Sequence, residues 1–130
     1  MNRIKFISLV LCVVAIGALH YLTPGQMIFF HSTLSKLSYF PIVMGAVWYG
    51  LQGGVSLAVL TSLGFIPHLL IFRGFGFESY LSELIEIVLY LSIGTIIGYI
   101  SGKEMRLKEK YKQISEKLEQ LSIYQLQLER

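Results

Sequence analysis

The sequence ESYLSELIEIVLYLSIGTIIGYISGKEMRLKEK, residues 78–110, decides the fold, because an apolar run passes directly into a basic, helix-forming stretch. Residues 80–101 supply the roughly 20 mostly apolar residues that a membrane-spanning helix needs. No proline follows Pro67 and no glycine follows Gly102, so nothing breaks the helix beyond the membrane. The segment predicts one helix that crosses a membrane and continues into the aqueous phase.

Three apolar runs precede this segment and predict a chain that crosses the membrane four times. Of its residues, 54% are hydrophobic and only 15% are charged, whereas soluble domains carry about a quarter charged residues. We therefore expect an all-α membrane protein with a transmembrane domain at 1–102 and spans near 4–22, 34–51, 54–72 and 80–101. The competing interpretation of the first run is a signal peptide, since Ala15 and Gly17 resemble a cleavage site.

The segments between the spans predict their connections. Polar and apolar residues mix at near-helical spacing in HSTLSKLSYF (31–40), which indicates an outer amphipathic or re-entrant helix. That helix would join the second span, with Pro41 as a kink. The uncharged Gln-Gly-Gly at 52–54 predicts a tight turn to the third span.

The distribution of Lys and Arg predicts the orientation. Arg3 and Lys5 precede the first span and six basic residues lie between Lys103 and Lys117, whereas the predicted outer loops hold only Lys36 and Arg73. Cytoplasmic flanks carry the excess of Lys and Arg. Both termini are therefore predicted in the cytoplasm, and the positive charge is explained without a nucleic-acid partner.

The last segment, 103–130, predicts a cytoplasmic coiled coil. Apolar residues alternate at spacings of four and three over about three heptads, with one polar residue in the same register. A coiled coil would make the chain a homodimer; a single solvated helix is the alternative. The predicted dimer seam consists of Leu107, Tyr111, Ile114, Leu118, Leu121, Gln125 and Leu128.

The histidines and two carboxylates are all predicted near the outer ends of the spans. Charged groups inside a membrane usually face a cavity or a partner, and imidazole with carboxylate suits Zn, Cu or Fe. We therefore predict a transition-metal site, with Glu83 accepting a ring N–H from a ligand histidine. Its proposed ligands are His20, His31, His68 and Glu86.

Other interpretations of these residues stay open. The imidazoles would equally suit a haem iron, and each histidine taken singly fits an interfacial structural role. The heptad register, extended back along the last span, reaches Glu86, so this carboxylate would face either the histidines or its own copy in a dimer. The single Cys12 excludes an intrachain disulfide. No nucleophile elbow, H-E-x-x-H motif or nucleotide loop occurs, so the chain itself is not expected to be an enzyme.

The order of these features resembles a known family. LHYLT, HSTLSKLSYFPIVMGAVWYGLQGG, LGFIPHLLIF, ELIEIVLY and the basic exit are together similar to the N-terminal sensor region of bacterial membrane-bound sensor histidine kinases. The resemblance implies the bacterial inner membrane, a two-component system, and kinase domains and a response regulator downstream of this chain. No histidine lies in the tail, so no phosphoacceptor carries over.

Taken together, the sequence predicts a membrane sensor that passes a signal from an outer metal or haem site through its last helix to a dimeric coiled coil. Two alternatives belong to other classes. One is a small-molecule-binding module similar to the substrate-binding subunit of a vitamin transporter. The other is a dimerising membrane anchor without a ligand.

Overall fold

The computed structural model describes residues 3–23, 28–71 and 77–129, and nearly all of these residues are helical. Three helical segments are long and apolar enough, by length and composition, to cross a membrane: Arg3–Leu22, Ser32–Pro67 and Leu81–Leu128. The predicted all-helical fold is thereby confirmed, and the length and apolar composition of these segments suit a membrane protein. The four helices are α1 (Arg3–Leu22), α2 (Ile28–Leu37), α3 (Tyr39–Ile71) and α4 (Phe77–Leu128).

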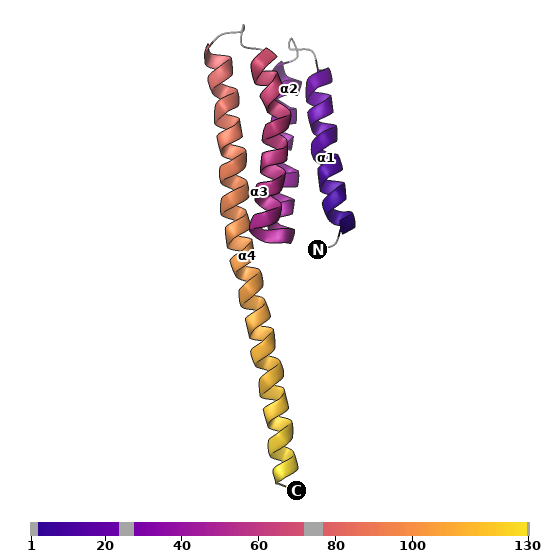
Figure 1. Cartoon of the computed structure of the whole chain (residues 1–130), viewed down its shortest axis with the longest axis vertical. Helices are drawn as coiled ribbons and strands as arrows, with labels where there is room; N and C mark the ends of the chain where they lie inside the picture. Colours follow the sequence, from indigo (N-terminus) through magenta and orange to yellow (C-terminus); the bar gives the residue numbers. More distant parts are fainter. Residues whose placement is uncertain (1–2, 24–27, 72–76, 130) are drawn as a thin grey trace.

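Helix α3 folds back on itself at Gly50, whose φ of 65° and ψ of −147° are not helical. Glycine adopts a positive φ without the steric cost that a Cβ brings. Figure 1 shows the resulting two limbs, residues 39–49 and 51–71, lying side by side and joined at the end of the bundle near the N-terminus.

This reversal corrects the turn predicted at 52–54, since those residues are helical. One residue with positive φ is enough to turn the chain, and Gly50 provides it. Gly53 has a different role: its Cα packs against the carbonyl of Gly45 on the other limb, where a side chain would not fit.

Helix α2 and the first limb of α3 follow one another with only Ser38 between them. The N–H of Ser38 donates to the carbonyls of Leu34 at 3.3 Å and Ser35 at 3.1 Å, so the helical path continues through this residue. Pro41 has no N–H to offer the carbonyl of Leu37. The predicted amphipathic helix and second span thus follow one another along one path, interrupted only at Ser38.

The core lies where α1 and α4 pack on α3. Ile42, Leu57, Ala58 and Tyr90 are completely buried. Elsewhere the bundle leaves large aliphatic side chains exposed, such as Leu11, Val14 and Ile96. An apolar outer surface is unfavourable in water and suits a helix bundle surrounded by lipid.

Glycines let α4 pack backbone against backbone on the second limb of α3. A methyl group added to Gly94 would lie 2.6 Å from the carbonyl oxygen of Gly54, and one added to Gly98 would lie 2.8 Å from the Cα of Leu51. Small residues allow this close approach between membrane helices. The contact ends near Gly102, and α4 continues beyond the bundle as a single helix (Figure 1).

Candidate functional site

A buried polar cluster joins α2 to α4; it consists of Ser35, Glu86 and Tyr90. The Ser35 hydroxyl donates a hydrogen bond to Oε2 of Glu86. The Tyr90 hydroxyl donates to the backbone carbonyl of Ser35 at 2.7 Å and lies 3.2 Å from the Ser35 hydroxyl. Ser35 is 3% exposed and Tyr90 is 0% exposed. A half-buried carboxylate is therefore held by a buried hydroxyl inside one subunit.

Helical spacing explains why each helix contributes its share of the polar cluster. Glu86 and Tyr90 are four residues apart, so both lie on the face of α4 that continues into Gly94 and Gly98. That face of α4 packs on α3. A side chain on it must therefore be long to reach past α3 to Ser35 in α2. Among the described residues, α2 and α4 have no close backbone approach, and these side-chain hydrogen bonds connect them directly.

Two aromatic rings of α3 pack against the ring of Tyr90. The ring of Tyr39 lies 4.7 Å from the Tyr90 ring, centroid to centroid, and the ring of Phe65 lies 5.6 Å from it. Both pairs are tilted, by 57° and 54°, a geometry that aromatic pairs favour over a face-to-face sandwich. The surroundings strengthen the hydrogen bonds of the polar cluster, because apolar rings exclude competing water.

His20 of α1 packs against the aromatic rings beside the polar cluster. It is 3% exposed, and its ring centroid lies 4.6 Å from that of Phe65. Phe65 in turn contacts Tyr90. Ring contacts thus run from His20, a predicted metal ligand, through Phe65 to Tyr90 of the polar cluster.

The other predicted ligands are placed by their backbones alone. His31 lies in α2 and His68 lies near the end of α3, and both side chains fall outside the described residues. Glu83 lies in α4 one turn before Glu86 and is half-buried. Within the described part of the chain, no three His, Cys, Asp or Glu side chains gather as a metal site would require.

Sequence reasoning missed Ser35 and Tyr90 because it looked for charged and metal-ligating residues. The sequence nevertheless contains a signal for each of these two residues. Tyr90 follows Glu86 at helical spacing, and Ser35 lies on the same face as Ser38, three residues later, in a segment expected to be amphipathic. Ser38 is likewise buried, at 2% exposure.

The tail of α4 carries the predicted dimer seam on its surface. Tyr111, Leu118 and Leu121 are each at least 60% exposed. Leu107 follows Gly98 by nine residues, which is about two and a half helical turns and puts them on opposite faces. The start of the seam therefore lies opposite Gly98, which packs on α3, and Glu86 hydrogen-bonds within its own subunit.

Ion pairs on the tail lie along the helix. Lys108 Nζ is 2.7 Å from Glu104 Oε1, and Lys112 Nζ is 3.9 Å from Glu116 Oε1. The hydrogen bond from Lys108 and its charge lower the pKa of the exposed Glu104 carboxyl. Pairs four residues apart stabilise a helix modestly and leave the apolar seam uncovered.

Comparisons of the chain with protein-family models, curated proteins and solved structures gave no match, so the function is argued from its own residues.

Proposed function

We propose that the chain is the membrane input module of a dimeric signalling protein of the sensor histidine kinase type. In it, α4 carries a change at the polar cluster to the tail. One observation supports this above the others. Helix α4 runs for 52 residues without a break, from Glu86 and Tyr90 near one end to an exposed apolar stripe at the other.

The polar cluster provides a contact that a signal can make or break. Each hydroxyl has one proton: that of Ser35 goes to Glu86, and that of Tyr90 goes to the Ser35 carbonyl. A proton or cation that neutralises Glu86 removes the charge that Ser35 stabilises. A hydrogen bond to a charged group contributes about 1.5–3 kcal/mol, enough to change the populations of two helix positions more than tenfold.

The α3–α4 interface suits such a movement. Its central contacts are close approaches between backbones at Gly54, Gly94 and Gly98. Small shifts of one packed helix along another are a common signalling movement. A displacement at Glu86 would be carried to the tail because the helix between them is continuous.

The proposed topology has four crossings with both termini in the cytoplasm of a bacterial cell. It is supported by the reversal at Gly50. Residues 28–49 and 51–71 form two antiparallel paths, each about 30 Å long at 1.5 Å per residue, which matches the hydrocarbon thickness. In this topology the basic tail emerges on the same side as Arg3 and Lys5, as the positive-inside rule requires.

The signal proposed from the sequence is a transition metal, bound by His20, His31, His68 and Glu86 with Glu83 in support; haem is the alternative. Imidazole nitrogen and carboxylate oxygen are donor atoms that suit a transition metal. Its binding would compete directly with the hydrogen bond between Ser35 and Glu86. In such a sensor Glu86 would leave the Ser35 hydroxyl in order to hold the metal.

Disulfide crosslinking of the tail in native membranes tests the proposal. In a Cys12→Ser background, Leu118→Cys should form a disulfide-linked dimer. Gln120→Cys, about 200° around the helix from position 118, should not. Adding Ser35→Ala should change the crosslinking rate at position 118 severalfold.

Two outcomes would contradict parts of this scheme. Equal crosslinking at positions 118 and 120 would reject the dimer seam. Efficient crosslinking at position 118 that Ser35→Ala does not change would favour the alternative, a dimerising membrane anchor without an input at the polar cluster.

A further inference from the structure

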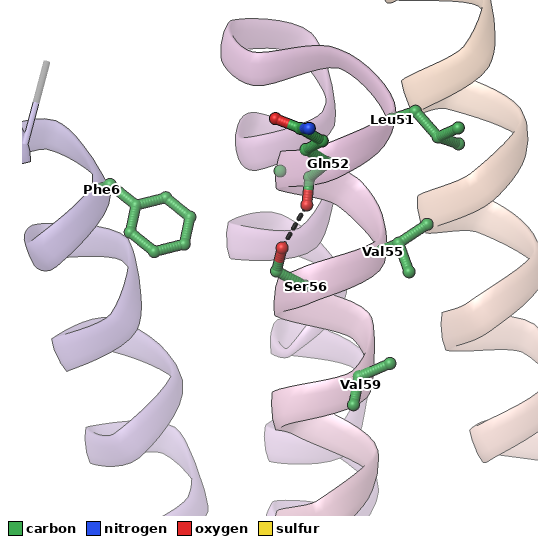
Figure 2. A pocket seen from close by; sticks show the side chains of 7 residues that line it. Phe6, Leu51, Gln52, Val55, Ser56 and Val59 are labelled. Atoms are coloured by element: carbon green, nitrogen blue, oxygen red, sulfur yellow. Dashed lines mark hydrogen bonds between the residues drawn. The ribbon is translucent and has the colours of Figure 1, made fainter. Parts of the chain in front are cut away.

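An open groove lies between α1 and the second limb of α3, at the end of the bundle that holds the N-terminus. Its volume is about 770 Å³, within the range of roughly 300–1,000 Å³ typical of small-molecule sites. Figure 2 shows Phe6 of α1 pointing across the groove toward α3. The groove is lined by Phe6, Leu51, Gln52, Gly53, Val55, Ser56 and Val59.

The wall of this groove is apolar along most of its length. The hydroxyl of Ser56 donates to the backbone carbonyl of Gln52, as the dashed line in Figure 2 marks, so its proton is used within the helix. Gly53 lines the groove without a side chain. The Gln52 amide lies toward the end near the N-terminus, and Val59 lies farther along (Figure 2). The groove is thus polar at one end only.

Positive charge gathers at that polar end. Lys5 precedes Phe6, and its Nζ lies 5.3 Å from the centre of the Trp48 ring. Arg3 begins α1 two residues earlier. The Met105 side chain approaches Gly50 at the chain reversal, which brings Lys103 and Arg106 to the same end of the bundle. Acidic side chains are fewer than these cations at that end of the bundle.

We propose that the groove binds an acyl chain of an anionic phospholipid, with its phosphate beside Arg3 and Lys5. The groove and such a lipid are complementary. An apolar channel open to the membrane matches a hydrocarbon chain, and the cations and the Gln52 amide match a phosphate. Basic pockets between membrane helices select anionic head groups in this way. The lipid would contact both α1 and the reversal of α3, next to the start of the tail.

The single Trp48 offers a direct test, since it lies beside Lys5. The full chain is reconstituted in phosphatidylcholine vesicles, and phosphatidylglycerol or phosphatidylcholine brominated on the acyl chain is titrated in. Bromine quenches tryptophan fluorescence at short range. We expect phosphatidylglycerol to quench at severalfold lower mole fraction. Fluorescence of each variant is normalised to the same vesicles without bromine.

Three variants separate the parts of the proposal. Lys5→Gln should abolish most of the preference for phosphatidylglycerol. Lys36→Gln, the same charge change in α2, should leave it intact. Val59→Phe, on the groove wall and 41% exposed in the wild type, should reduce quenching by both lipids by filling the groove.

The proposal is overturned by any of three results. The first is equal quenching of the wild type by the two lipids. The second is a preference that Lys5→Gln and Lys36→Gln reduce equally, which would mean general surface charge. The third is full quenching and preference in Val59→Phe, which would mean that the chain lies outside the groove. None of these bears on tail crosslinking, so this inference and the proposed function fail independently.

Discussion

The hydroxyl of Tyr90 donates a hydrogen bond to the backbone carbonyl of Ser35, 2.7 Å away and 55 residues earlier in the chain. It does so across a bundle in which α2 and α4 have no close backbone approach among the described residues. With the bond from Ser35 to Glu86, it joins α4 to α2 through hydrogen bonds that the side chains of α4 make to the hydroxyl and the backbone carbonyl of Ser35. Such a contact can change without unpacking the helices.

Replacing Ser35 with Ala should destabilise the protein by about 2 kcal/mol, because Glu86 loses a donor to its charge. Unfolding in mixed micelles of dodecyl maltoside and SDS measures the change. Ser32→Ala, at an exposed position of the same helix, should stay within about 0.5 kcal/mol.

The same assay tests whether Ser35 acts through the charge of Glu86. In a Glu86→Gln background, Ser35→Ala should cost at least about 1 kcal/mol less than in the wild type, as expected for directly coupled groups. Additive costs would show that Ser35 stabilises the bundle by packing and not through the carboxylate.

Tyr90→Phe keeps the buried ring and removes the hydrogen bond to Ser35, so we expect a loss of about 1 kcal/mol. Tyr99→Phe is the matched control, since Tyr99 lies in the same helix and is 63% exposed. Chemical denaturation of the two variants side by side makes the comparison. Equal stabilities would argue against an energetic role for the Tyr90 hydroxyl.

Gly94→Ala should destabilise the α3–α4 interface by about 1–3 kcal/mol, the usual cost of overpacking. The added methyl group would meet the Gly54 carbonyl, which cannot move without bending α3. Gly64→Ala has nothing within 4 Å of its added methyl group and should stabilise the protein by up to about 1 kcal/mol, because alanine is favoured over glycine inside a helix. The thermal midpoint of detergent-purified protein, followed by circular dichroism, distinguishes them; a tolerated Gly94→Ala would contradict the tight packing.

The metal hypothesis predicts one transition-metal ion per chain in purified protein, measured by elemental analysis together with an absorption spectrum that would also reveal haem. His68→Ala and Glu86→Ala should each lower the metal content at least tenfold. Metal-free protein that takes up neither added zinc, copper, iron nor haem would reject this hypothesis. It would leave the hydrogen bonds of the polar cluster as the input.

Local patterns in the sequence determined most of the helices and their character. The apolar run at 80–101 and the absence of proline after Pro67 predicted the long α4, which the structure extends from Phe77 to Leu128. Spacing of four residues placed Glu86 and Tyr90 on one face. These features depend on residues within a few turns of one another, so the sequence alone reveals them.

Only the tertiary structure decided where the chain reverses and which groups meet. Any of several glycines near residue 50 had the freedom to turn the chain, and packing of Gly53 and Gly54 against neighbouring backbones left the turn to Gly50. Likewise, helical periodicity shows that Glu86 has neighbours but not which helix supplies them. Ser35 becomes its partner because α3 holds α2 and α4 within side-chain reach, a distance set by close packing between glycines far apart in the sequence.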